Sequence, residues 1–354
     1  MLQTLARPKS QAFPSLEAPI RLITTIQRAD GAIPWFADGI WDSWNHVECA
    51  MALEVAGELK AADRAYDYLV TSQAENGAWY CEYGNTAAMV DELYMSRETA
   101  GSFYDTNFAA YCATGIWHRY LHRQDANDLR HYWPMVRKAI DFVLTLQSDW
   151  GDIAWSSEAV EFGPDDSVRA GNASIRKSLE CAIRIAFVVR DMKRANRYRR
   201  ALLKLDIALE RHAHRFDRSG DDRSMYAMDW YYPAMCGVHK GHEATKVLSD
   251  SWTTFVKPEL GCHCVSTEPW ITVAESAELA ITLTSLGGRD LARNILQRQF
   301  NHRDDDGCFW MGYQYEEDIF WPREKPSWTQ AAMVLAVETL RSGSPTACVL
   351  GQHL

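Results

Sequence analysis

The 354-residue chain lacks the features that mark several large classes of protein. No run of 18 apolar residues is present, so no membrane-spanning helix is expected. The N-terminal residues MLQTLARPKSQAF contain no apolar core of the kind that a signal peptide needs. No P-loop, dinucleotide-binding glycine fingerprint or G-x-S-x-G motif occurs. We therefore expect a cytoplasmic protein that needs no cofactor.

Positive charge is also scarce. The chain has 37 Lys and Arg against 47 Asp and Glu, a net charge of -10. Nucleic-acid binding needs a basic footprint, so no nucleic-acid partner is expected, and an anionic membrane surface is disfavoured as well. The nine cysteines are odd in number and irregularly spaced, which is typical of reduced thiols. Cys262-His263-Cys264 has no second matching pair, so no metal site is predicted.

The chain is instead rich in one repeated pattern: an amphipathic helix, a Gly turn, an aromatic loop and a more apolar second helix. Six outer helices alternating with six inner ones predict an all-α fold, the (α/α)6 toroid or six-hairpin barrel, with no strand-rich segment. We expect this toroid to form one domain over residues 14–354, after an N-terminal arm at residues 1–13. The predicted turn glycines are Gly31, Gly77, Gly151, Gly220, Gly261 and Gly307.

Helical spacing of apolar residues predicts the individual helices. The expected ranges are 14–27, 43–57, 59–73, 127–147, 192–215, 241–256, 271–286 and 289–301, with further helices after Asp105 and Asn172 and a closing helix from Thr329.

Tryptophan is abundant, and its placement is informative. Eleven of the fourteen tryptophans lie in or beside the turn loops. Aromatic side chains gathered on one set of loops predict a rim around a ligand pocket. Such walls suit sugars, whose apolar ring faces stack on aromatic rings, and they also suit the carbocations of terpenoid cyclisation.

Two segments resemble glycoside hydrolases. YDTNFAAYCATGIWHRYLHRQDANDLRHYWPMVRKAIDFVLTLQ resembles glucoamylase-type and trehalase-type enzymes, in which a D-x-N-F helix precedes a W-P-x-V helix. GIWDSWNHVECAMAL resembles the W-D-S opening of related sugar hydrolases, whose Asp contacts sugar hydroxyls. The resemblance implies a six-hairpin toroid that hydrolyses a glycosidic bond of a small-molecule sugar.

A second resemblance points to another chemistry. QAENGAW fits the Q-x3-G-x-W repeat of squalene-hopene-type cyclases, whose toroid is shared by prenyltransferase β-subunits and bacterial prenyltransferase-like proteins. This implies an isoprenoid substrate. The D-x-D-D acid motif of class II cyclases lacks its first Asp here, because Asp165-Asp166 follow Gly163. A third alternative is a non-catalytic toroid that binds a glycan or a partner.

The glycosidase resemblance implies two catalytic carboxylates. Inverting enzymes place an acid and a base on either side of the bond, about 6.5–9.5 Å apart. The resemblance puts the acid in the third loop, here Glu158, and the base in the sixth, here Glu316. Because Ala154 separates Ile153 from Trp155, the acid is displaced from its usual place directly after Ile-Trp. Asp229 is the rival acid, since its aromatic neighbours would desolvate it and raise its pKa.

Other residues are predicted to bind the substrate. Asp42 and Asp105 are each either a helix N-cap or a ligand contact. His46 is either a polar group of the pocket or a hydrogen-bonded core histidine. Glu275 shares a helix face with Glu278, so at least one should face the pocket. The full predicted set is Trp35, Trp41, Asp42, His46, Asp105, Trp155, Trp230, Tyr231, Glu268, Trp270, Glu275, Trp310, Tyr313 and Trp321.

Overall fold

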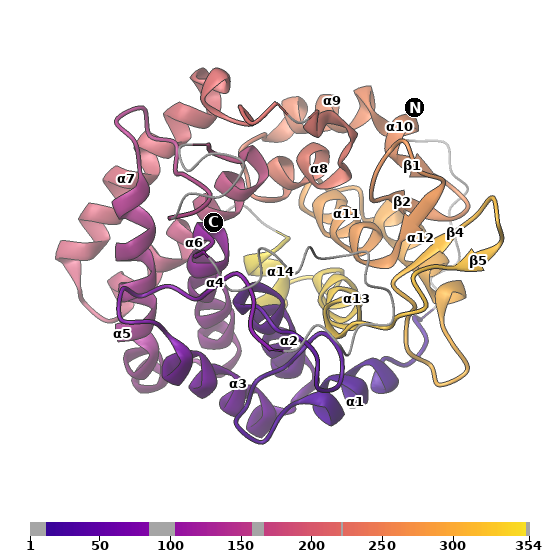
Figure 1. The fold of residues 1–354 in the computed structure, drawn as a ribbon, viewed down its shortest axis with the longest axis horizontal. Helices are drawn as coiled ribbons and strands as arrows, with labels where there is room; N and C mark the ends of the chain where they lie inside the picture. The colour runs from indigo at the N-terminus through magenta and orange to yellow at the C-terminus, as the bar shows by residue number, and fades with distance from the viewer. Residues whose placement is uncertain (1–11, 85–102, 158–165, 221, 352–354) are drawn as a thin grey trace. The chain divides into compact units, whose positions relative to one another are not determined.

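The computed structural model describes residues 12–84, 103–157, 166–220 and 222–351. The chain divides into two compact units. The first unit comprises residues 26–223 and the second comprises residues 1–25 with 224–353. Each unit is built mainly of helices (Figure 1). Among the helices of the described ranges, none is long and apolar enough to cross a membrane.

The first unit consists of three helical hairpins. The inner helices α2, α4 and α6 are buried on most sides and pack side by side, α2 on α4 and α4 on α6. The outer helices α3, α5 and α7 are amphipathic and bury one face each. The bounds are α2 Ser43–Ala56, α3 Leu59–Ser72, α4 Thr106–Arg123, α5 Ala126–Val143, α6 Arg169–Val188 and α7 Met192–Arg211, with 3-10 turns at Leu144–Leu146 and Ala213–Arg215.

The second unit combines helices with a small sheet. The helices are α1 Glu17–Ile26, α8 Ala227–Met235, α9 Gly241–Asp250, α10 Trp252–Phe255, α11 Val273–Ser285, α12 Arg289–Gln299, α13 Ser327–Thr339 and α14 Pro345–Val349, with 3-10 turns at Arg223–Met225 and Phe300–His302. The strands are β1 Val256–Lys257, β2 Gly261–His263, β3 Trp270–Thr272, β4 Gly312–Gln314 and β5 Ile319–Phe320.

These strands form an antiparallel sheet in the order β1-β2-β3-β4-β5. Cys262 pairs with Thr272, and Ile271 pairs with Tyr313, so residues from two successive loops share one sheet. The sequence analysis expected no strand-rich segment, and the structure adds this small sheet to an otherwise helical chain. Each strand is only two or three residues long, which leaves too few positions for an alternating pattern to show in the sequence.

The predicted turn glycines all adopt a left-handed backbone, with φ between +83° and +150°. At Gly151 a Cβ atom would also lie 2.2 Å from the carbonyl oxygen of Lys204. Similar close approaches occur at Gly31, against Arg64, and at Gly77, against Lys138. At these three turns glycine is thus needed both for the backbone conformation and for contact with the next outer helix.

Three of these turns are closed by the same device, which we call the glutamine clasp. The amide nitrogen of a glutamine four residues before the glycine donates to the glycine's own carbonyl and to a carbonyl of the next outer helix. The three clasps are Gln27 to Gly31 (3.1 Å) and Ala61 (2.9 Å), Gln73 to Gly77 (2.8 Å) and Met135 (3.0 Å), and Gln147 to Gly151 (3.0 Å) and Ala201 (2.9 Å).

A buried ion network joins the first two hairpins. Arg119 of α4 is 2% exposed and bonds to Glu54, Asp63 and Asp128, each at 2.7 Å. Its guanidinium also lies over the rings of Tyr66 and Tyr132, at 5.3 and 5.1 Å from their centroids. Breaking one partner of such a network leaves the remaining charge buried without compensation, which is strongly destabilising.

The loop tryptophans divide into two groups. Trp41 and Trp79 are fully buried, at 1% and 0% exposed, and fill the core of the first unit. Trp35 and Trp44 are only partly buried and remain accessible to a ligand. A position in a turn loop therefore does not by itself place a tryptophan at a surface.

Candidate active site

The loops that precede the inner helices of the first unit lie side by side. Isolated antiparallel bridges join Trp41 to Tyr83, Tyr80 to Tyr104, and Asp105 to Ser156. The backbone of Trp41 both donates to and accepts from Tyr83, each at 2.9 Å. Segments more than 20 residues apart in sequence are thus held together at the N-terminal ends of α2 and α4 (Figure 1).

This pairing gathers four carboxyl groups, which we call the carboxylate cluster: Asp42, Glu48, Glu82 and Asp105. Asp42 caps α2 by accepting from the backbone of Asn45 at 2.8 Å. Asp105 caps α4 by accepting from the backbone of Phe108 at 2.9 Å. The charge of Asp42 raises the pKa of each of the other three, as expected if each of them lies close to Asp42.

The carboxyl group of Asp42 accepts several hydrogen bonds. Besides the cap, it accepts from the indole of Trp35 at 2.7 Å and from the side-chain amide of Asn45 at 2.6 Å. Burial raises the pKa of Asp42 above its ordinary value, and these hydrogen bonds act in the opposite direction. A carboxylate that accepts several hydrogen bonds is stabilised in its ionised form.

Glu82 has the opposite environment. It is 5% exposed, and neither of its carboxyl oxygens has a hydrogen-bond partner among the described residues. Burial raises the pKa of Glu82 to about 7, and repulsion from Asp42 adds to the effect. A proton on Glu82 removes both the desolvation cost and the repulsion. Burial raises the pKa of both Glu82 and Asp42, but only Asp42 has hydrogen-bond donors for its charged form among the described residues.

The remaining two members of the cluster lie against aromatic rings. Glu48 accepts from the indole of Trp44 at 3.2 Å and from the hydroxyl of Tyr111 at 3.1 Å. Burial raises the pKa of Glu48 to about 7, and that of Asp105 also to about 7. Trp44 packs edge-on against Phe108, with ring centroids 5.6 Å apart. Partly exposed aromatic rings therefore border titratable carboxyl groups.

Such an arrangement can bind and hydrolyse a polar, ring-shaped ligand. Acid catalysis near neutral pH needs a carboxyl group whose pKa has been raised toward 7, and the cluster supplies several. Charged carboxylates accept hydrogen bonds from sugar hydroxyls, and aromatic faces cover the apolar side of a sugar ring. The described residues contain no group of three His, Cys, Asp or Glu side chains placed to hold a metal ion.

The structure places several predicted residues of the first unit in or next to this cluster. Asp42 and Asp105 belong to it and serve as N-caps, and Trp35 donates its indole N–H to Asp42. Trp155 is partly buried and packs edge-on against Phe103, 5.0 Å between centroids. Glu158, the predicted acid, lies outside the described residues.

Trp41 and His46 lie in the core below the cluster. Trp41 stacks on Tyr83 with ring centroids 4.3 Å apart. His46 accepts from the backbone of Ile33 at 3.1 Å, and its other ring nitrogen bonds to the carbonyl of Ala65 at 2.9 Å. Burial lowers the pKa of His46 to about 4. His46 is thus a hydrogen-bonded core histidine, one of the two alternatives that the sequence left open.

The other predicted residues belong to the second unit. Asp229 is partly buried in the first turn of α8, whereas Glu268 and the predicted base Glu316 are exposed in loops. Trp230 stacks on Phe255 at 4.9 Å and Trp270 packs against Trp321 at 5.2 Å. Trp310 stacks on Phe320 at 5.8 Å, and Tyr313 donates to Asp318 at 2.6 Å.

Glu275 and Glu278 of α11 both have hydroxyl partners. Glu275 accepts from Thr272, and Glu278 accepts from the buried Tyr231. Both carboxyl groups remain partly accessible. The structure therefore brings Tyr231, Glu275 and Glu278 together within the second unit, as the helical spacing of the two glutamates suggested.

The sequence analysis missed Glu82 and did not select Glu48. Glu82 stands alone between Cys81 and Tyr83 and belongs to no motif. The available signal was a single carboxylate in a short aromatic stretch directly after a predicted turn. The proximity of Glu82 to Asp42 depends on the bridge between Trp41 and Tyr83, and no local sequence pattern predicts this bridge.

Comparison with known proteins agrees with the class of protein that the fold and the carboxylate cluster define, a glycoside hydrolase. A solved structure of a glycosidase variant in complex with glucose has a TM-score of 0.69 and 13% identity, and the match covers 96% of each chain. A rhamnosidase from Klebsiella oxytoca with rhamnose bound has a TM-score of 0.62 and 15% identity, covering 92% of this chain and 64% of the other. At such low identity these likenesses show the fold alone.

Sequence similarity then shows the family. The chain is 36% identical over 323 residues to the MMP endo-(1,4)-3-O-methyl-alpha-D-mannosidase of Mycolicibacterium hassiacum, covering 91% of this chain and 85% of the relative. The chain belongs to the family of this mannosidase. No model of a protein family matches it.

These findings separate the alternatives. The predicted all-α toroid class and the glycoside hydrolase function are confirmed. The resemblance to terpenoid cyclases and prenyltransferases is not confirmed by the relatives described above. The single domain over residues 14–354 stays a prediction, and the arm at residues 1–13 lies almost wholly outside the described residues.

Proposed function

We propose that the chain hydrolyses α-mannosidic bonds within a chain of 3-O-methylated mannose units. The observation that carries this proposal is the 36% identity to the endo-mannosidase over nearly the full length of both proteins. Identity at this level, over this coverage, favours a shared substrate class. The carboxylate cluster supports the same class of reaction, because its members suit both proton transfer and hydroxyl binding.

The acid of this proposed reaction is Glu82. When protonated, Glu82 donates its proton to the glycosidic oxygen as the bond from that oxygen to the anomeric carbon breaks. A second carboxylate takes a proton from the water that attacks the opposite face of the sugar, and the anomeric configuration inverts. Support for Glu82 comes from its burial, its lack of hydrogen-bond partners among the described residues and its raised pKa.

The base of the proposed reaction is Glu316, from the loop that the resemblance to glucoamylases indicated. We likewise propose that the chain is an (α/α)6 toroid of six hairpins, as the repeat pattern of its sequence predicts. Glu316 is exposed, as a carboxylate that activates water needs to be before substrate binds.

Substrate binding is proposed to rest on the aromatic side chains beside the carboxylate cluster. Trp35 and Trp44 are partly exposed, and each donates its indole N–H to a carboxyl group of the cluster. Their rings are therefore fixed in orientation before a sugar arrives. A 3-O-methyl group replaces a hydroxyl donor with apolar surface, which an aromatic wall accommodates better than a ring of carboxylates.

The test is hydrolysis of α-1,4-linked manno-oligosaccharides with and without 3-O-methyl groups. We expect the methylated oligosaccharides to be hydrolysed faster than the unmethylated ones. In an NMR time course, the β anomer of the new reducing end should appear first. The variants Glu82→Gln, Glu158→Gln, Asp229→Asn and Glu316→Gln then assign the roles. The catalytic assignment is wrong if the Glu82 and Glu316 variants retain full activity. Saturable glycan binding without turnover by the unmodified protein would instead favour a non-catalytic function.

A further inference from the structure

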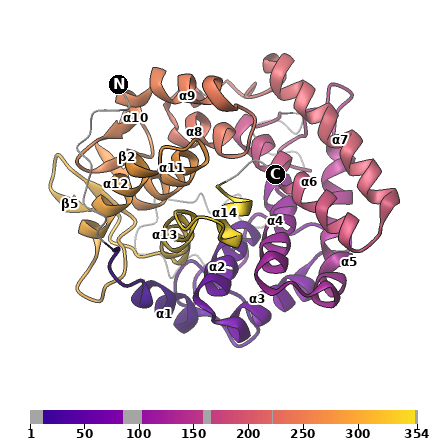
Figure 2. The same cartoon turned by 180° about the vertical axis from the view of Figure 1, so that it is seen from behind.

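The outer face of α7 stands apart from the rest of the chain in charge. Residues 192–211 contain seven Lys and Arg against two Asp and Glu, a net charge of +5 in a protein whose net charge is -10. The buried face of this helix consists of Ala195, Tyr198, Ala201, Leu205, Ala208 and Leu209, and it packs on α6. Figures 1 and 2 both show α7 on the side of α6 away from α4.

The face of α7 opposite its buried side carries a stripe of apolar residues. Met192, Leu203 and Ile207 fall on one line of the helix, because their spacings of 11 and 4 residues are close to whole turns. Their exposed fractions are 47%, 57% and 45%. Burial of such side chains is favourable, so their position on the outside of a helix needs an explanation.

Neighbouring elements widen this stripe. Phe187 at the end of α6 is 38% exposed and lies under the guanidinium of Arg199, at 5.2 Å. Trp150, which is 52% exposed, lies at the C-terminal end of α7 beside His212, at 5.0 Å between centroids. Ten large apolar side chains are exposed in the described part of the chain, and half of them belong to this surface.

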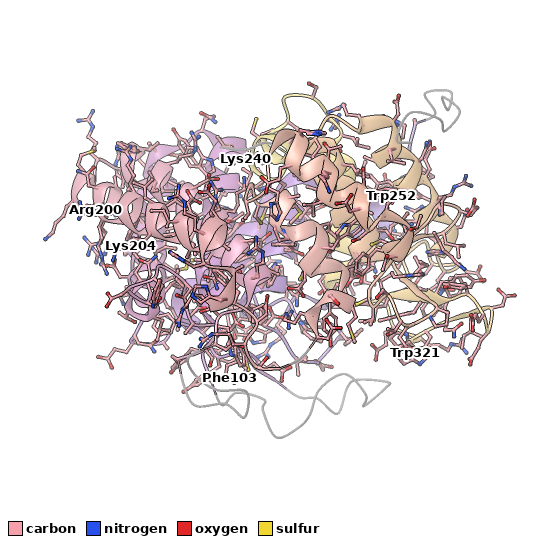
Figure 3. All side chains as sticks on the ribbon, turned by 90° about the horizontal axis from the view of Figure 1, so that it is seen from above. Phe103, Arg200, Lys204, Lys240, Trp252 and Trp321 are labelled. Atoms are coloured by element: carbon pink, nitrogen blue, oxygen red, sulfur yellow. The ribbon has the colours of Figure 1, made fainter. Side chains whose placement is uncertain are left out.

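A row of cations runs along one flank of the stripe: Lys193, Arg200, Lys204 and Arg211. All four are exposed. Within the described ranges, Lys193, Arg200 and Lys204 take part in no ion pair. Figure 3 shows Arg200 and Lys204 on the outer side of α7, with Arg200 pointing into solvent.

We propose that this surface of α7 docks on an anionic lipid bilayer. An apolar stripe flanked by a row of Lys and Arg is the arrangement of helices that lie at a membrane interface, where the apolar side chains enter the headgroup region and the cations meet lipid phosphates. The net charge of the whole protein opposes this only weakly, because charges more than about 8 Å from the bilayer are screened at physiological salt.

Two other occupants fit the surface less well. A second copy docked through the same face would bring together two helices of net charge +5 each, since a twofold interface uses the same patch on both subunits. Nucleic acid provides phosphates that the cations can bind, but its backbone has no apolar surface to cover the exposed Leu203 and Ile207.

Vesicle sedimentation tests the proposal with the full-length protein. We expect it to sediment with vesicles of phosphatidylglycerol mixed with phosphatidylcholine at physiological salt, and not with vesicles of phosphatidylcholine alone. The variants Arg200→Glu with Lys204→Glu, and Leu203→Ser with Ile207→Ser, should each weaken this binding by at least about tenfold. Circular dichroism and hydrolytic activity show that each variant is folded.

A matched control is available on α9. Lys240 at the N-cap of α9 and Lys246 within α9, which pairs with Asp250, are exposed cations of a helix without an apolar stripe. Lys240→Glu with Lys246→Glu makes the same change in net charge. We expect this control to bind vesicles as the unmodified protein does. Equal loss in the control, no dependence on phosphatidylglycerol, or unchanged binding of both α7 variants would overturn the proposal. Self-association that depends on Leu203 and Ile207, without vesicle binding, would also overturn it and assign the face to a second copy.

Discussion

Replacing Glu82 by glutamine should make the protein more stable at high pH while removing its activity. Burial raises the pKa of Glu82 from 4.5 to about 7. A shift of one pKa unit corresponds to about 1.36 kcal/mol, so an ionised Glu82 lowers the free energy of unfolding by about 3 kcal/mol as an upper value. Glutamine has nearly the same shape and no charge, and it therefore avoids this cost.

The sign of the pH dependence follows from the direction of the shift. Below pH 4.5 Glu82 is protonated in the folded and the unfolded chain, and its charge has no effect on stability. Between pH 4.5 and about 7 the unfolded chain ionises first, so the stability of the unmodified protein falls as pH rises. Above about 7 the full cost is present. The difference in stability between Glu82→Gln and the unmodified protein should thus grow with pH and then level off.

Urea unfolding at a series of pH values measures this difference. Glu75→Gln is a suitable control, because Glu75 is an exposed carboxylate close to Glu82 in sequence. Its curve should run parallel to that of the unmodified protein. If the Glu82→Gln curve also runs parallel, the carboxyl group of Glu82 is solvated and the argument for its role as an acid fails. A gain in stability accompanied by a loss of about 100-fold or more in kcat is the expected result.

Three further changes test other parts of the structure. Asp105→Asn should keep the N-cap of α4 and, because burial raises the pKa of Asp105 to about 7, should raise the free energy of unfolding above that pH, whereas Asp105→Ala should leave the free energy of unfolding about 1 kcal/mol below that of Asp105→Asn. Gly151→Ala should lower it by about 3 kcal/mol or more, because φ is +102° and the added Cβ would meet Lys204; a smaller loss in thermal unfolding would show that the turn can move. Arg119→Met should lower the free energy of unfolding by about 3 kcal/mol, because the buried Glu54 then keeps only Arg123 as an ion-pair partner and Asp128 loses Arg119; partial recovery on adding Glu54→Gln would show in a double-mutant cycle that Arg119 and Glu54 interact.

Much of the helical framework follows from local sequence. α2, α3 and α12 begin and end within two residues of their expected bounds, because each is a continuous apolar or amphipathic segment set between turn residues. The turn at Gly77 was also predictable, since only glycine fits its backbone and its contact with Lys138. The strand Gly261–His263 was not, because three residues carry no periodicity and its partner Trp270–Thr272 immediately precedes a helix.

The candidate site was predictable only in part. Asp42 and Trp35 were identified because a W-D-S segment opens a helix after an aromatic loop, and the structure joins them through one hydrogen bond of 2.7 Å. Glu82 was missed because its neighbours in space are distant in sequence. Trp41 shows the reverse problem: its loop position suggested a ligand surface, but stacking on Tyr83 buries it. Whether a side chain is buried depends on which distant segments contact it. Local sequence patterns do not reveal these contacts.

The glutamine clasps have a consequence for how the first unit is made. Each clasp ties a turn to the outer helix that follows it in the chain: Gln73, for instance, holds both Gly77 and Met135. A hairpin can therefore be locked as soon as the next outer helix leaves the ribosome, and assembly proceeds in the direction of synthesis without waiting for the C-terminus. Coupling between neighbouring hairpins also limits the effect of a mutation. Loss of one clasp loosens two adjacent hairpins and leaves more distant hairpins intact.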